Sequence, residues 1–233
     1  MSDVVYLKRY KGDEGKLNDI NYKELWRYAG YMGGPDSGDD ALNSLLEETL
    51  KECQGIYNYG VCYTRFELTF AEANVVLPFE VTSDNLNNLL KESREAVMFA
   101  ATIGGQIDRM IAKYERFNPT KALLLQALGA ERVEALCDTF CNEINESLKA
   151  EGYMITPRFS PGYGDVPLDI QKDFMRILDC NRKIGVTLND SLLMAPSKSV
   201  TAIFGITRLD DCQMSSDGSN CDICNMVECD YRH

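Results

Sequence analysis

The segment Arg158-Phe159-Ser160-Pro161-Gly162-Tyr163-Gly164-Asp165 interrupts the helix and strand patterns of this 233-residue chain. It therefore marks a boundary between the elements that precede it and those that follow it. A proline and two glycines within four positions exclude a regular helix or a central strand. Glycine adopts positive φ angles and lets a ligand approach the backbone closely. Arg158 adds a planar guanidinium whose five donors suit a carboxylate or a phosphate. The segment is therefore either a surface turn between two elements or a ligand-binding loop.

The longest helical pattern lies upstream of this segment, from Asn118-Pro119-Thr120 to near Gly152. Apolar residues recur along it at helical spacing, and Gly129 is a candidate point of division. Glu134 lies beside the apolar stripe, near small residues, so a partly buried acid and a solvated glutamate are both compatible with the pattern. The stripe consists of Val133, Cys137, Phe140, Ile144 and Leu148.

Strand patterns flank this helix on both sides. Residues 65–70 alternate apolar and polar side chains and are followed by an apolar run at 75–79, which predicts an antiparallel hairpin. Residues 96–102 are typical of a buried strand. Residues 199–207 alternate again, with the apolar side chains at even positions facing one way, which predicts a half-buried strand.

Shorter helical patterns occupy much of the remaining chain, and residues 1–20 have the polar composition of an extended arm. Helices mixed with hairpin-type strands favour an α+β fold with an antiparallel sheet over a doubly wound α/β fold. We predict one domain over residues 1–210 and a distinct tail over 211–233. The shorter helices are expected at 22–31, from 42 to near 53, and at 83–90, 107–114 and 169–178.

Composition narrows the class of function. The formal net charge is −12, which argues against nucleic acid as a partner because phosphate binding requires clustered Lys and Arg. No apolar run approaches the length of a membrane span, and Met1-Ser2-Asp3 does not begin a secretory signal. Nine cysteines without such a signal predict a reducing, cytoplasmic location. The only histidine is His233, which argues against Ser-His-Asp, Cys-His and histidine–zinc catalysis.

The polar tail carries a candidate metal site. Cys221 and Cys224 form a C-x2-C pair, which lets two thiolates reach one metal, and Cys212 and Cys229 can complete four ligands. Thiolates suit an iron–sulfur cluster or zinc, and the third reading is a tail of reduced thiols without metal. The other cysteines lie within apolar patterns and are interpreted as small core residues: Cys53, Cys62, Cys137, Cys141 and Cys180.

Three ordered blocks carry a family resemblance. Arg158 to Tyr163 resembles the R-x-A-P-G-Y loop of the activation domain of cobalamin-dependent methionine synthase, with Ser160 where the family more often has alanine. Residues 185–196 are similar to that domain's G-x-x-L-[TN]-[ED]-S-x-x-M-x-P segment, and Ser199-Val200 continues it. Glu134-Ala135 falls in the helix where the family places an acidic ligand residue. Residues 1–95 match only loosely, as in free-standing versions of the domain.

The resemblance implies an α+β fold with a twisted antiparallel sheet and flanking helices. It implies that the chain binds S-adenosylmethionine and supports reductive remethylation of cob(II)alamin, with cobalamin carried by a partner. The partner would be methionine synthase or another corrinoid protein, served by a reductant such as flavodoxin or ferredoxin, and this chain would be an accessory subunit. The family's N-terminal acidic contact is assigned to no residue. Ligand contacts are implied at Glu134, Arg158, Ser160, Gly162 and Tyr163.

Two other functions are compatible with parts of the sequence. An iron–sulfur electron-transfer or activator protein for a corrinoid methyltransferase system would use the cysteine tail and leave the Arg158 segment incidental. A general S-adenosylmethionine methyltransferase is disfavoured because no glycine-rich nucleotide signature follows a first parallel strand. Methyl transfer from a sulfonium needs no general base, so the lack of an internal histidine does not argue against reactivation. The task of such a protein is to position two cofactors.

Overall fold

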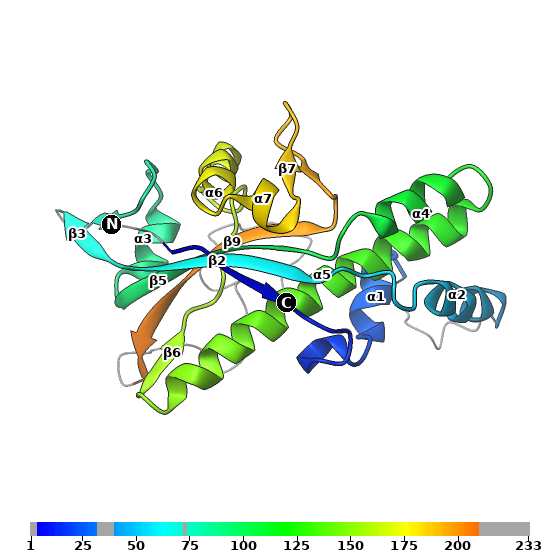
Figure 1. Ribbon diagram of the computed structural model, residues 1–233, viewed down its shortest axis with the longest axis horizontal. Coiled ribbons are helices and arrows are strands. Elements are labelled where there is room, and N and C mark those ends of the chain that lie inside the picture. The colour runs from blue at the N-terminus through cyan, green and yellow to red at the C-terminus, as the bar shows by residue number, and fades with distance from the viewer. Residues whose placement is uncertain (1–3, 32–39, 72–73, 210–233) are drawn as a thin grey trace.

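A computed structural model of the chain describes residues 4–31, 40–71 and 74–209. Its centre is a curled five-stranded sheet in the order β1-β2-β5-β9-β6, with every neighbouring pair antiparallel (Figure 1). The strands of this sheet are β1 (Tyr6–Arg9), β2 (Gly60–Glu67), β5 (Ser93–Thr102), β6 (Tyr153–Ile155) and β9 (Ser199–Arg208). Two short hairpins lie outside it, β3 (Thr69–Ala71) with β4 (Asn74–Val76) and β7 (Thr187–Leu188) with β8 (Met194–Ala195).

Helices cover both faces of the sheet. One face packs against α5 together with α1, α2 and α4, and the other packs against α3, α6 and α7 (Figure 1). Alternation along β5 divides its side chains accordingly, since Val97 and Phe99 belong to the α5 side and Met98 belongs to the opposite core. The helices are α1 (Tyr22–Tyr28), α2 (Asp40–Glu52), α3 (Asp84–Leu90), α4 (Gln106–Tyr114), α5 (Pro119–Lys149), α6 (Gln171–Ile177) and α7 (Cys180–Ile184).

The α5 helix is the longest element and crosses the sheet diagonally (Figure 1). The side chain of Asn118 accepts a hydrogen bond from the Lys121 amide, and Pro119 occupies the first turn, where its missing N–H costs nothing. Gly129 does not divide the helix, because the 31 residues run without interruption to Lys149. A side chain at position 129 would come within 3.0 Å of Lys198, which packs across this part of the helix.

Two further sequence-based expectations were wrong. The first is the polar arm: within residues 1–20, Tyr6–Arg9 forms the edge strand β1 and residues 15–21 cross α5. The second is the half-buried strand at 199–207, because β9 is buried on both faces. Its even-numbered apolar side chains do face α5 together, but the opposite face is covered by a second helical layer. Periodicity within one strand carries no information about what covers its other face.

Other expectations were confirmed. The fold is α+β with an antiparallel sheet and flanking helices. The hairpin predicted from residues 65–70 and 75–79 is confirmed only in part: β3 pairs with β4, but residues 65–67 belong to β2 of the central sheet. All five cysteines outside the tail are buried and none of them forms a disulfide bond, as expected for small core residues. As a separate finding, none of the helices in the described ranges combines the length and the apolar composition that a membrane span requires.

Candidate functional site

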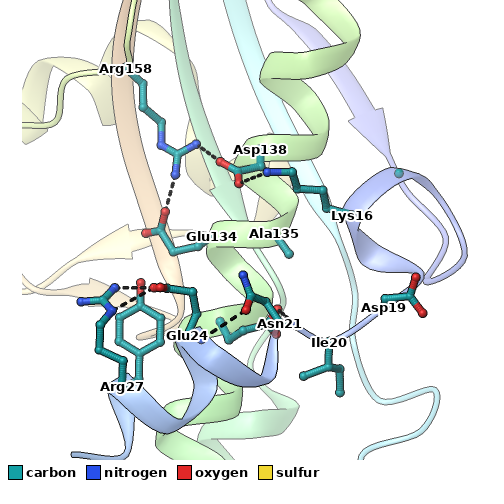
Figure 2. A pocket seen from close by; sticks show the side chains of 13 residues that line it. Lys16, Asp19, Ile20, Asn21, Glu24, Arg27, Glu134, Ala135, Asp138 and Arg158 are labelled. Atoms are coloured by element: carbon teal, nitrogen blue, oxygen red, sulfur yellow. Dashed lines mark hydrogen bonds and ion pairs between the residues drawn. The ribbon is translucent and has the colours of Figure 1, made fainter. Parts of the chain in front are cut away.

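A charged cleft of about 570 Å³ lies between α5, α1 and the segment that precedes α1 (Figure 2). One wall is α5, the second is formed by residues 15–28, and Arg158 enters from the segment that follows β6. Carboxylates outnumber cationic groups among its lining side chains. The lining residues are Gly15, Lys16, Asp19, Ile20, Asn21, Glu24, Arg27, Tyr28, Glu131, Glu134, Ala135, Asp138 and Arg158.

Strand alternation aims Arg158 into this cleft. The next residue, Phe159, bridges Ile203 of β9 through two backbone hydrogen bonds of 2.8 and 2.9 Å and buries its ring in the core on the far side of the sheet. Successive side chains of an extended segment point to opposite faces, so Arg158 faces α5. Burial of Phe159 therefore fixes the direction of Arg158.

The Arg158 guanidinium is held by two carboxylates of α5. Its Nη2 pairs with Glu134, and its Nη1 donates to Asp138 Oδ1 at 2.5 Å (Figure 2). Glu134 and Asp138 are four residues apart and lie on one helical face. Burial by itself would lower the pKa of Arg158, but the neighbouring thiols and carboxylates raise it above its ordinary value. Arg158 is thus a fixed cation at the cleft wall.

Asp138 is shared between two cations. Its second oxygen accepts from Lys16 Nζ at 2.8 Å, and the Lys16 amide donates to Thr139 Oγ1 at 3.0 Å. Burial would raise the pKa of Asp138, but Arg158 and Lys16 outweigh burial and lower it below its usual value. Asp138 is therefore ionised at neutral pH and bridges α5, Arg158 and the second wall.

A buried ion pair on α5 holds the second wall in place. Arg132 and Glu131 are each 3% exposed and are joined by two hydrogen bonds of 2.5 and 2.6 Å. Arg132 also donates to the backbone carbonyls of Leu17 and Asp19, at 3.1 and 2.6 Å. Glu131 Oε1 accepts from the Asn21 amide at 3.0 Å. Because both charges are satisfied by this wall, the pair fixes residues 17–21 against α5.

The first helix completes the cleft with a local ion pair and a tyrosine. Arg27 donates to Glu24 through its Nε and Nη2, at 3.0 and 2.5 Å (Figure 2). Burial and the nearby Glu134 carboxylate raise the pKa of Tyr28 to about 12, so its phenol is protonated at neutral pH. The α1 side thus offers a carboxylate and an aromatic ring to a bound molecule.

The structure brings only two of the five predicted ligand residues, Glu134 and Arg158, to the cleft lining. Ser160, Gly162 and Tyr163 lie in the turn beyond it, where the Tyr163 amide donates to Ser160 O at 3.3 Å. Gly162 and Gly164 have φ angles of 90° and 55°, the positive values that glycine allows. Tyr163 is 61% exposed.

The turn is attached to α3 rather than to α5. Asp165 accepts hydrogen bonds from the Ser83 hydroxyl at 2.5 Å and from the Asp84 amide at 2.7 Å, at the N-terminus of that helix. A side chain at Gly164 would overlap Asn85 of the same helix at 2.2 Å. The segment 158–165 therefore links the two faces of the sheet.

The cysteine tail is not part of the described chain. Cys212, Cys221, Cys224 and Cys229, predicted as metal ligands, all lie outside the described residues. Within the described ranges, no group of three or more His, Cys, Asp or Glu side chains is arranged to hold a metal ion.

The sequence did not lead us to Asp138 or to residues 15–28 as parts of the cleft. Asp138 could have been found, because it follows Glu134 by one helical turn. The wall formed by residues 15–28 gave no local signal, since Lys16 and Asp138 are 122 positions apart in the chain.

Fold and cleft together define a class of protein: an α+β domain with a charged cleft between its longest helix and an N-terminal wall. The sequence model of the family described as "Vitamin B12 dependent methionine synthase, activation domain" matches residues 81–208, more than half of the chain. The chain therefore belongs to this family, as the three sequence blocks predicted.

A solved structure of the MetH reactivation domain bound to AdoHcy shares the fold. Its TM-score is 0.67 at 14% identity, over 91% of this chain and 80% of that chain. No curated protein matches the sequence. Because it covers 91% of this chain, the structural likeness extends beyond the residues 81–208 that the family model matches.

Proposed function

We propose that this protein binds S-adenosylmethionine in the cleft and supports the reductive remethylation of cob(II)alamin on a cobalamin-dependent methionine synthase or a related corrinoid protein. The observation that carries the proposal is the fixed Arg158 cation among the carboxylates of the cleft, in a member of the activation-domain family. S-adenosylmethionine supplies an electrophilic methyl group, and a reductant such as flavodoxin or ferredoxin supplies one electron to the corrinoid. The cobalamin belongs to the partner.

The lining side chains fit the charges of this ligand. Its amino-acid end carries a carboxylate, which suits the guanidinium fork of Arg158. Its ammonium and sulfonium are cations, which suit the carboxylates of Glu134, Asp19 and Glu24. A charge-assisted hydrogen bond contributes about 1.5–3 kcal/mol, so two or three of them would supply a large part of the binding free energy of the ligand. Asp19 and Glu24 are the candidates for the N-terminal acidic contact of the family.

We propose that the turn after Arg158 contacts the adenosyl end of the ligand. Ser160, Gly162 and Tyr163 follow Arg158 within five positions, and Gly162 leaves its backbone open to close approach. The exposed Tyr163 ring suits stacking on adenine. Together with Glu134 and Arg158, these residues are the proposed ligand set.

The direct test is calorimetry with S-adenosylmethionine and Arg158→Lys. We expect at least tenfold weaker binding, because an ammonium cannot reproduce the planar fork. The matched control is Arg65→Lys, since Arg65 also donates two hydrogen bonds to carboxylate oxygens, in its case both of Glu95, and lies away from the cleft. Equal affinity of wild type and Arg158→Lys would remove Arg158 from the site.

The reactivation step needs its own measurement. Cob(II)alamin on a corrinoid protein, a reductant and S-adenosylmethionine should give methylcobalamin and S-adenosylhomocysteine faster when this protein is present, which an absorbance change of the corrinoid reports. Binding of S-adenosylmethionine without any acceleration on methionine synthase or other corrinoid proteins would reject the reactivation role and retain the binding site.

A second function rests on the C-x2-C spacing in residues 211–233, which we take as a unit separate from the domain at 1–210. We propose that Cys212, Cys221, Cys224 and Cys229 hold an iron–sulfur cluster or zinc, which in the first case would make the chain an electron-transfer or activator protein. Protein purified without oxygen should carry metal, and Cys221→Ser with Cys224→Ser should remove it without changing the melting temperature of the domain. Metal-free wild type would reject this site.

A further inference from the structure

The Arg158 guanidinium is already shared by two carboxylates, so a ligand carboxylate cannot simply be added to it. A third carboxylate would place three negative charges around Arg158 and Lys16 in a half-buried site, where Coulomb repulsion is only weakly screened. One of the two protein carboxylates must therefore give way if the ligand is to use Arg158.

The two carboxylates are not held equally. Asp138 has a cation on each oxygen, Arg158 at 2.5 Å and Lys16 at 2.8 Å, and Lys16 is itself tied to α5 through Thr139 Oγ1. For Glu134, by contrast, Arg158 is the one ion-pair partner within the described part of the chain, and its side chain is 40% exposed. Glu134 is thus the carboxylate that can leave at lower cost.

We propose that binding exchanges ion pairs: the ligand carboxylate replaces Glu134 on Arg158, Glu134 turns to the ligand's ammonium or sulfonium, and Asp138, clamped by Lys16, keeps the guanidinium in position. Asp138 is a positioning residue, because it acts on the ligand through Arg158. This inference rests on the proposed function and specifies how the cleft distinguishes its ligands.

Charge balance gives the direction of that selectivity. Arg158, Lys16, Glu134 and Asp138 together are neutral. S-adenosylmethionine brings one negative and two positive charges. Once its carboxylate pairs with Arg158, both its ammonium and its sulfonium are available to the released Glu134. S-adenosylhomocysteine has lost the sulfonium charge and offers Glu134 only its ammonium. The exchange therefore favours the methyl donor over the demethylated product, which promotes product release.

Three adenosyl compounds separate this exchange from a structural role. S-adenosylmethionine carries carboxylate, ammonium and sulfonium; S-adenosylhomocysteine lacks the sulfonium; 5′-methylthioadenosine lacks all three charged groups. Their affinities are measured by calorimetry on the full chain, for wild type, Asp138→Asn, Glu134→Gln and the control Glu146→Gln, an exposed α5 glutamate paired with Lys149.

Each variant has a distinct expected pattern. Asp138→Asn should weaken both amino-acid-bearing compounds at least tenfold and leave 5′-methylthioadenosine within twofold. Glu134→Gln should weaken S-adenosylmethionine at least fivefold more than S-adenosylhomocysteine. If Asp138→Asn fails to fold, Lys16→Met tests the clamp with an exposed side chain and should weaken the same two compounds, by a smaller factor.

Other patterns overturn the inference. A uniform loss for all three compounds in Asp138→Asn would show a structural role, and no loss would show that Arg158 needs no second anchor. Tighter binding of S-adenosylmethionine by Glu134→Gln would show that Glu134 only competes for Arg158. Wild type that binds none of the three compounds would instead reject the proposed function itself, and the exchange with it.

Discussion

Arg132 is buried, with 3% of its surface exposed. Its guanidinium pairs with Glu131 and donates hydrogen bonds to the backbone carbonyls of Leu17 and Asp19. Such a pair adds little net stability compared with apolar side chains of the same volume, because two desolvation penalties offset the attraction. Its role is geometric, since it determines where residues 17–21 lie against α5. At the scale of single residues, the cleft depends on two guanidinium groups: Arg158 lines the cleft, and Arg132 holds the opposite wall.

Removing one partner of the buried pair should be costly. Arg132→Met leaves the Glu131 carboxylate buried without its cation, although the Asn21 amide still donates to it. We therefore expect a loss of about 3–5 kcal/mol in the free energy of unfolding. Urea titration followed by circular dichroism measures it. The double variant Glu131→Gln with Arg132→Met removes both charges and should recover part of the loss. A loss below about 1 kcal/mol in the single variant would contradict a buried, uncompensated carboxylate.

At the scale of elements, the segment 158–165 connects α5 on one face of the sheet with α3 on the other. Arg158 pairs with α5, Phe159 bridges β9, and Asp165 accepts hydrogen bonds from Ser83 and the first amides of α3. The Asp165 carboxylate thus acts on α3 as a second N-terminal cap beside Ser83, which itself accepts from the Leu86 amide. This junction fixes the turn that follows Arg158.

The Asp165 contacts predict a pH-dependent stability. Burial would raise the pKa of Asp165, but the Ser83 hydroxyl and the amides of α3 lower it below its usual value in the folded protein. A lowered folded pKa stabilises the protein above the unfolded value, about 3.9, and that stabilisation is lost as the pH falls through the folded pKa. Asp165→Asn should therefore lower stability by about 0.3–1 kcal/mol at pH 7, because it removes the negative charge at the N-terminus of α3.

Melting curves of wild type and Asp165→Asn from pH 7 down to pH 3 measure this dependence. The difference between the two proteins should shrink as the pH falls, because the wild-type carboxylate takes up a proton. Asp169→Asn is the matched control, since Asp169 is a nearby exposed aspartate, and it should change stability little. A difference that stays constant across this pH range would contradict the role of the Asp165 charge.

At the scale of the whole molecule, the family match and the folding unit have different extents. The match covers residues 81–208, but β2 pairs with β5 along its full length, from Gly60 with Thr102 to Glu67 with Glu95. The core on the α5 side also takes buried side chains from residues before 81. These include Leu25, Trp26, Leu46, Cys53 and Val61.

Truncation separates the two extents. A chain of residues 81–208 would expose one edge of β5 and a large apolar face of α5, so we expect aggregation or non-cooperative unfolding. A chain of residues 1–209 keeps every described element and should unfold cooperatively at the wild-type temperature, with unchanged ligand affinity. Calorimetry and size-exclusion chromatography measure both chains. A cooperative, monomeric 81–208 fragment would contradict this view of the domain.

The sequence by itself determined the family of this protein and most of its longer elements, but not the edge strand β1. The long helix after Asn118-Pro119, the alternation at 199–207, the hairpin at 69–76 and the glycine turn after Arg158 are encoded by neighbours within a few residues, so periodicity and turn chemistry reveal them. The blocks at 134, 158–163 and 185–200 identified the family for the same reason, since each is a contiguous motif.

Only the tertiary structure decided which residues share the cleft. Lys16 meets Asp138, and Arg132 meets the carbonyl of Leu17, across more than a hundred positions of sequence. Such contacts depend on how β1 adds to the sheet edge and how residues 15–21 then cross α5, and this packing choice leaves no period in the local sequence. The same holds for the burial of the second face of β9 and for the pairing of Arg158 with both Glu134 and Asp138. Both depend on where the helices pack against the sheet.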